Sequence, residues 1–375
     1  MNLLDMIFDQ NNFPFWIIVI AAIIGPIAII SRPFSTYVKF VYPNAKFEAM
    51  GNPFVGDKEL DSIVDSKDIV SFKETINTLK DYNVSGDDTY SIQKSLDDTF
   101  IETVEMMRND SSKKMNDFFD TYLEKLDIHL IKNHLKIKLE GREIDEKRIN
   151  DSILSSTRKL LAKIMDAEKE ELPQILKDYG FDNELIQVVS MDTVDFLKID
   201  TIIDKYVINK FTQVKVPYKC EQGKRRFVKT LTDIINIKNV LRAKQLGYDE
   251  ESCKKLFIGE GREIPPWKYN ELSELESVSQ IINSLEGTSY YDALKDTIEI
   301  YNKEQSVQVL ETALDSLLLK HVRDISTQNY ISIGPTIRFL VSKEFEIRNL
   351  KIITKGVSEN ISPDVIKTFL VKEVY

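Results

Sequence analysis

The sequence predicts an all-helical protein: three similar helical domains around a pseudo-threefold axis, preceded by an N-terminal transmembrane helix. Three observations lead to this prediction. The 375 residues include only 13 glycines and 11 prolines while 29% are charged, which favours helices over a turn-rich sheet protein. Residues 10–31 carry no charge. A charged, amphipathic segment occurs three times along the rest of the chain.

The N-terminal segment predicts a membrane span over residues 11–31. Its core, "FPFWIIVIAAIIGPIAII", approaches the roughly 20 apolar residues that one span needs. A signal peptide is the alternative, but no basic region precedes the run, which is long for one. Two aspartates precede the segment and Arg32, Lys39 and Lys46 follow it, which predicts a body on the cytoplasmic face of the cell membrane. The residues that mark the segment are Phe15, Trp16, Ile17, Ile18, Pro26 and Ile30.

The rest of the chain has the period of amphipathic helices. In "IRFLVSKEFEIRNLKII", Ile337, Leu340 and Ile347 fall at helical spacing with charged residues between them. Alternating runs long enough for strands are scarce, so a sheet is expected to be a small local addition at most.

The repeated segment reads "HLIKNHLKIKLEG" (129–141), "INIKNVLRAKQLG" (235–247) and "FEIRNLKIITKG" (345–356). In each copy a glycine follows the asparagine by 8, 8 or 7 positions, which suits the left-handed end of a helix. An apolar-Asp pair also precedes each asparagine, by 36, 39 and 34 positions. The asparagines are 106 and 110 residues apart, so the repeats are domains and not turns of a solenoid.

A partial fourth copy, "YPNAKFEAMG" (42–51), opens the body, so the chain begins and ends partway through a unit. The predicted domains are 37–118, 119–226 and 227–375. The repeat markers are Asn44, Asn133, Asn239, Asn349, Gly51, Gly141, Gly247 and Gly356. We expect the asparagines to cap helices or to form hydrogen bonds between them.

Catalytic, cofactor-binding and metal-binding sites are not predicted. His129 and His134 are five residues apart, so on a helix they point in different directions and do not form a metal pair. "GEGR" (259–262) has the glycines of a phosphate loop without the Gly-Lys-Ser/Thr that should follow. Cys220 and Cys253 have no metal-type spacing, and a disulfide between them has no support.

The formal net charge of -10 argues against nucleic-acid binding, and no small-molecule substrate is predicted. Basic residues are instead the candidate contacts with protein partners, although such charges are often simply solvated. The densest cluster lies in "CEQGKRRF" (220–227), and others adjoin the repeated asparagines. The candidate partner-binding residues are Lys46, Lys132, Lys224, Arg225, Arg226, Lys238 and Arg348.

Over roughly residues 37–375 the sequence resembles the C subunit of archaeal A-type ATP synthases and its vacuolar-type ATPase homologue, the d subunit. The strongest match is "IGPTIRFLVSKEFEIRNLKIITKG". "YPNAKFEAMG" resembles the family's entry motif, with Lys46 in place of the usual arginine. "FIGEGREIPPWKYNEL" resembles its Gly-Gly-Arg turn, with Glu260 between the glycines.

The resemblance implies a three-domain helical funnel that is not an enzyme. It implies partners in the central stalk and the membrane rotor ring, and a role in coupling the two during proton- or sodium-driven ATP synthesis or ATP-driven ion pumping. The N-terminal helix is then expected to thread the ring lumen or to lie in the lipid bilayer. The alternative is a single-pass, membrane-anchored helical scaffold for an unrelated cytoplasmic partner.

Overall fold

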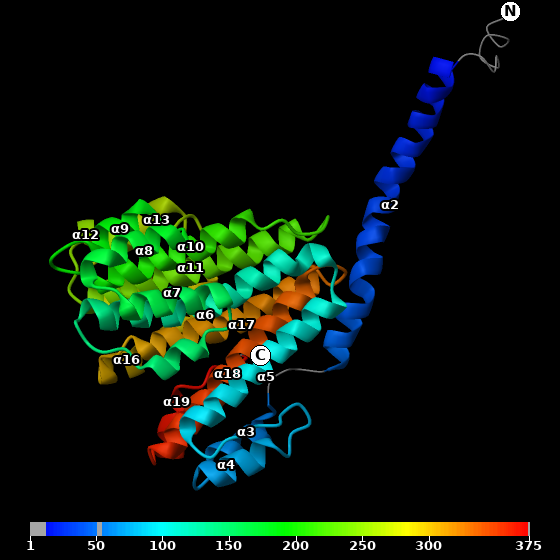
Figure 1. Ribbon diagram of the computed structural model, residues 1–375. Helices are drawn as coiled ribbons and strands as arrows, with labels where there is room; N and C mark the ends of the chain where they lie inside the picture. Colours follow the sequence, from blue (N-terminus) through cyan, green and yellow to red (C-terminus); the bar gives the residue numbers. More distant parts are fainter. Residues whose placement is uncertain (1–12, 51–54, 374–375) are drawn as a thin grey trace, which may run out of the picture.

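The computed structural model describes residues 13–50 and 55–373, and its regular elements there are helices without any strand (Figure 1). The all-helical part of the prediction is therefore confirmed. The marker Gly51 lies outside the described residues. The predicted domain boundaries and the funnel shape stay predictions.

Long helices build the body and an arm. They are α2 (Phe13–Ala49), α5 (Thr89–Asp110), α6 (Asn116–Leu139), α10 (Phe196–Gln213), α11 (Glu221–Gln245), α17 (Gln308–Gln328) and α18 (Gly334–Ser358).

Shorter helices connect the long ones. They are α3 (Asp57–Val64), α4 (Ile69–Ile76), α7 (Ser155–Asp166), α8 (Leu172–Tyr179), α9 (Asn183–Val189), α12 (Glu250–Lys254), α13 (Pro266–Glu274), α14 (Val278–Ser284), α15 (Ser289–Lys295), α16 (Ile298–Glu304) and α19 (Pro363–Thr368). Three 3-10 turns lie at Lys113–Met115, Glu146–Asp151 and Lys169–Glu171.

The long body helices pack in a row. α6 lies against α10, α10 against α11, α11 against α17, α17 against α18 and α18 against α5 (Figure 1). Three helical hairpins result along the chain, with turns at residues 111–115, 214–220 and 329–333. Since α5 precedes α18 by more than 200 residues, this row packs an early and a late segment of the chain side by side.

Helix α18 occupies the most enclosed place in the row, because α2, α3, α4, α5, α17 and α19 all contact it. Most of its residues are buried, including charged ones, so it lacks the single apolar stripe of a surface helix. Gly334 permits the close approach of α17, since a Cβ there would lie 2.8 Å from the Cα of Ser326. Gly356 likewise lies against Ile366 of α19.

The repeat glycines do not all behave alike. Gly141 and Gly247 adopt left-handed conformations, with φ of 69° and 77°, directly after α6 and α11. Only glycine adopts this conformation without strain, so both helices end there. Gly356 instead lies inside α18, and Asn360 takes the left-handed conformation after that helix ends. The glycine pattern therefore marked two helix ends and one close helix contact.

The prediction of a transmembrane helix over residues 11–31 is wrong. In the part of the chain that the structure describes, no helix combines the length and the apolar character that crossing a membrane requires. The apolar residues from Phe13 onward belong to the 37-residue helix α2, which continues unbroken through Lys39 and Lys46 to the body. The local pattern gave no sign of this continuation, because contacts with distant residues hold the last third of α2 in place.

Helix α2 is fastened to the body by its last third. Phe40 and Phe47 are buried, and the ring of Phe47 stacks on Phe339 of α18 with 5.5 Å between centroids. Asn44 donates to the carbonyl oxygens of Tyr330 (2.6 Å) and Ser332 (3.0 Å). Towards its N-terminus, α2 projects away from the body as an arm (Figure 1).

Replacing Asn44 with alanine should loosen this attachment. The carbonyls of Tyr330 and Ser332 would lose their donor at a buried position, at a cost of about 1–3 kcal/mol. We expect amide hydrogen exchange over residues 40–49 to become about 5- to 150-fold faster. Asn133→Ala is the matched control, because Asn133 is exposed and its side chain bonds to no other described residue. Equal exchange in the two variants would contradict the role of Asn44.

Candidate functional site

The three hairpin turns meet at one end of the body, which we call the hairpin-turn end. Gly223, just after the second turn, lies against Asn329 and Ile333 of the third turn. Asn44 binds the third turn from α2, and Lys46 forms a 2.6 Å ion pair with Asp110 beside the first. Helix α2 therefore bridges the first and third turns at its own attachment point.

Three aromatic rings pack against one another inside the body, next to the hairpin-turn end. Phe211, near the end of α10, contacts Phe118 of α6 and Phe227 of α11 in edge-to-face geometry, with centroids 5.8 and 6.0 Å apart. All three rings are fully buried. The first and second hairpin turns are thereby held side by side, since Phe118 and Phe211 each lie close to one of them.

Ion pairs join the long helices in a pattern that repeats. On α6, Lys132 pairs with Asp204 (2.5 Å) and Lys136 pairs with Asp200 (2.6 Å) of α10. On α11, Lys238 pairs with Asp315 (2.6 Å) and Arg242 pairs with Glu311 (2.5 Å) of α17. In both cases two cations one helical turn apart face two carboxylates one turn apart on the neighbouring helix. The spacing of 106 residues between the asparagines also separates these two sets of cations.

The third copy departs from this pattern. Arg348, which corresponds to Lys132 and Lys238, pairs with Asp315 of α17 at 2.8 Å. Lys351, one turn further on, pairs with Asp97 of α5 at 2.6 Å. Asp315 thus accepts from two cations on different helices. Burial would raise its pKa, but Lys238 and Arg348 outweigh that effect and hold the pKa of Asp315 below its usual value.

Two further carboxylates shape the loops that follow the long helices. Asp233 of α11 accepts the backbone N–H groups of Arg262, Glu263 and Ile264, and burial raises its pKa in spite of these bonds. Asp127 of α6, 106 residues earlier, accepts two such groups in the same way. The "GEGR" segment therefore binds an internal carboxylate, through the N–H group of Arg262. A Cβ on Gly261 would lie only 1.7 Å from an oxygen of Asp233.

In the third copy the position of Asp233 is taken by Lys343. Its ammonium lies 2.6 Å from Glu346 and 2.8 Å from the hydroxyl of Tyr82, all three groups being buried. Burial raises the pKa of Glu346, although Lys343 acts against it. Asp127 and Asp233 were missed at the level of sequence, where the 106-residue spacing between them was the available signal. Asp315 was marked there as part of the apolar-Asp pair that precedes Asn349, without its ion pairs.

The predicted partner-binding residues are spread over different settings. Four of them form the internal ion pairs described above: Lys46, Lys132, Lys238 and Arg348. Lys224 is buried and donates to the carbonyls of Thr212 and Val214 at the end of α10. Arg226 is half-buried, and this burial lowers its pKa. Arg225 is exposed at the hairpin-turn end. Partner contact by these residues stays a prediction.

The repeat asparagines likewise differ. Asn239 donates to the carbonyl of Leu256, and Asn349 exchanges two hydrogen bonds with the backbone of Val371. Both are buried, like Asn44, and each ties a distant segment to its helix. Asn133 is exposed, so the first complete copy lacks this tie.

His129 is exposed on α6. Desolvation, with Lys132 nearby, lowers the pKa of its imidazole below the usual value. Within the described ranges, no group of histidine, cysteine and acidic residues is arranged to hold a metal ion. Cys220 and Cys253 are buried and unpaired with each other.

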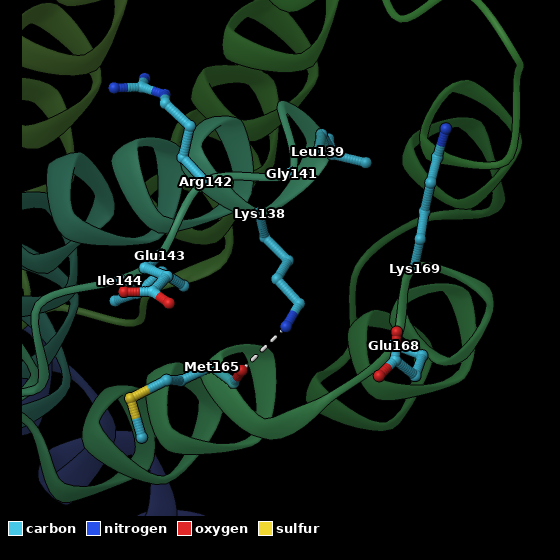
Figure 2. Close-up of a pocket in the computed structure, with 9 residues that line it drawn as sticks. All are labelled: Lys138, Leu139, Gly141, Arg142, Glu143, Ile144, Met165, Glu168 and Lys169. Atoms are coloured by element: carbon cyan, nitrogen blue, oxygen red, sulfur yellow. Dashed lines mark hydrogen bonds between the residues drawn. The ribbon is translucent and has the colours of Figure 1, made fainter.

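A surface hollow of about 510 Å³ lies where α6 ends. Figure 2 shows Lys138 reaching across it to the carbonyl oxygen of Met165, at 2.8 Å. Charges of both signs, among them Arg142 and Glu168, line it together with apolar side chains. The lining holds no nucleophile paired with a base, so the hollow offers no catalytic arrangement.

The geometry defines an all-helical protein whose long helices are joined by ion pairs. Residues 43–369 match the family model described as ATP synthase (C/AC39) subunit, and the chain belongs to this family. It is a non-catalytic central-stalk subunit of a rotary ATP synthase.

Curated relatives agree in length and name. The C subunit of the A-type ATP synthase of Methanothermobacter thermautotrophicus is 28% identical over 92% of this chain and 91% of its own. The protein of the same name from Methanobrevibacter smithii is 28% identical over 92% and 90%. That of Pyrococcus horikoshii is 27% identical over 89% and 90%.

Asp315→Asn should destabilise the protein at neutral pH, because Lys238 and Arg348 would lose the carboxylate that neutralises them. We expect a loss of about 3 kcal/mol in the free energy of unfolding, measured by urea denaturation. A carboxylate with a lowered pKa stabilises the fold above its ordinary pKa, and this contribution disappears as the pH falls through the folded-state value. The difference between variant and parent should therefore be full at pH 7 and vanish in acid.

Asp292→Asn provides the control for that measurement. Asp292 pairs with Lys295 at 2.7 Å, but its side chain is 76% exposed. Solvent screens an exposed pair and leaves it little effect on stability, so this variant should stay close to the parent. Equal effects of the two substitutions would mean that Asp315 has no special structural role.

Proposed function

We propose that this chain couples the membrane rotor ring to the central stalk of an A-type rotary ATP synthase, during proton- or sodium-driven ATP synthesis or ATP-driven ion pumping. The family match over residues 43–369 carries the proposal. The membrane association of such a complex, with this body on its cytoplasmic side, belongs to the same proposal. A scaffold for an unrelated partner is not favoured by the family match.

The internal ion pairs support a mechanical role. A protein that transmits torque must resist sliding between its own helices. In the body, paired charges at 2.5–2.8 Å fix the register of α6 on α10, of α11 on α17 and of α17 on α18. Sliding one helix by a turn would separate half-buried charges from their partners, at a cost of several kcal/mol.

Helix α2 is the proposed contact with the ring. Most of the large apolar side chains described in its outer part are exposed, among them Phe13 and Ile30, each at 74%. A helix that is apolar all round is stable only when other apolar groups cover it. Its attachment across two hairpin turns would carry force from such a contact into the body.

Affinity purification through a C-terminal tag, in mild detergent from native membranes, tests the coupling role. Mass spectrometry should identify the other subunits of a rotary ATP synthase with the full chain, and weaker retention of them with a chain that begins at Arg32. Recovery of the full chain alone, or with unrelated proteins, would contradict the proposed function.

A photo-cross-linking amino acid at Ile30 should capture the ring protein inside the assembled complex. The same amino acid at Ile300 is the matched control, because Ile300 is an exposed isoleucine on α16, at the side of the body away from α2 (Figure 1). Capture of the ring protein from Ile300 but not from Ile30 would overturn the assignment of α2.

A further inference from the structure

Unpaired cations gather at the hairpin-turn end, although the protein as a whole is acidic. Lys113 and Lys114 lie in the first hairpin turn, and Lys215 and Lys219 lie in the second. Arg225 lies near the N-terminal end of α11, and Lys39 lies on α2 next to its attachment. We call these six residues the basic collar. All six are exposed, and none pairs with a carboxylate of residues 13–50 or 55–373.

The acidic residues at this end make contacts with groups outside the collar. Asp110 pairs with Lys46, and Glu221 pairs with Lys224 at 3.0 Å. Glu48 accepts a 2.7 Å hydrogen bond from Tyr330. Asp117 lies at the N-terminal end of α6, and the N-terminus of a helix stabilises a negative charge. Among the described residues, none of these four carboxylates forms an ion pair with a residue of the collar.

Exposed tyrosines and the apolar arm adjoin the collar. Tyr37 and Tyr42 lie on α2, Tyr218 in the second turn and Tyr330 in the third, each between 45% and 61% exposed. A tyrosine combines an apolar ring with a polar hydroxyl, and at membrane–water interfaces such side chains lie beside lysine and arginine. The collar thus lies at the end of the body where the arm is attached, and the arm's outer side chains are mostly exposed and apolar.

We propose that the basic collar is a docking surface for anionic lipid headgroups. Phosphate groups complement its unpaired lysines, and the hydrocarbon beneath the headgroups complements the neighbouring apolar and tyrosine side chains. An acidic protein surface would satisfy the charges alone, so the combination favours lipid. This docking goes beyond the coupling role and does not require it.

Vesicle sedimentation of the full chain tests the proposal. The partition coefficient is measured on neutral phosphatidylcholine vesicles and on vesicles with about a third phosphatidylglycerol, whose negative surface attracts nearby lysines. The ratio of the two coefficients isolates the charge-dependent part, because the apolar arm is present in both measurements. We expect a ratio well above one at low salt that falls towards one at about 0.5 M salt.

Lys113, Lys114, Lys215 and Lys219 are then changed together to glutamine. The ratio should fall at least about tenfold. The matched control changes Lys67, Lys80, Lys147 and Lys303 to glutamine, which alters the net charge equally. These four are exposed and lie towards the opposite ends of the long helices. All eight side chains are at the surface, and thermal unfolding followed by circular dichroism verifies that both variants fold.

An unchanged ratio in the collar variant, or an equal fall in both variants, would overturn the proposal. It would also be overturned if the collar variant lost its copurifying ATP synthase subunits while its vesicle ratio stayed unchanged, because the collar would then be a protein contact. Failure of the coupling role shows separately, as the absence of those subunits from purifications of the unaltered chain.

Discussion

A buried carboxylate shared by two cations governs how the long helices fit together. Asp315 of α17, only 4% exposed, lies 2.6 Å from Lys238 of α11 and 2.8 Å from Arg348 of α18. An isolated charge at this depth would be strongly unfavourable, so α11, α17 and α18 must keep the one register that brings the three groups together. Helices α6 and α10 are held by a similar pair of ion pairs at the other end of the row.

The hairpin-turn end depends on this register. The three turns meet only because the helices that lead into them are aligned, and α2 uses two of them as its attachment through Asn44 and Lys46. A stiff body with an arm fastened across two turns suits a protein that passes force between partners. The basic collar places positive charge at the end of the body where that arm is attached. A lipid surface, which offers both phosphate and hydrocarbon, would fit there.

Much of the fold and of the family relation could be read from the sequence. The helices, the 106-residue register and the resemblance to the A-type ATP synthase family depend on local periodicity and residue identity. The membrane-span prediction was wrong, since a run of apolar residues does not show that its helix continues onto the body. Asn133 carried the same signature as Asn239 and Asn349, yet it is exposed without their ties, because no distant backbone approaches it.

The sequence by itself determined that the chain is helical, that its charged helix recurs and that no catalytic motif accompanies it. Only the tertiary structure decided which basic side chain pairs with which carboxylate. Lys132 and Lys238 keep equivalent partners, whereas Arg348 pairs with the acid already bound to Lys238. Lys351 finds Asp97, 254 residues away. Side-chain partners across such distances depend on how helices pack, and the packing is a property of the whole chain that no local pattern contains.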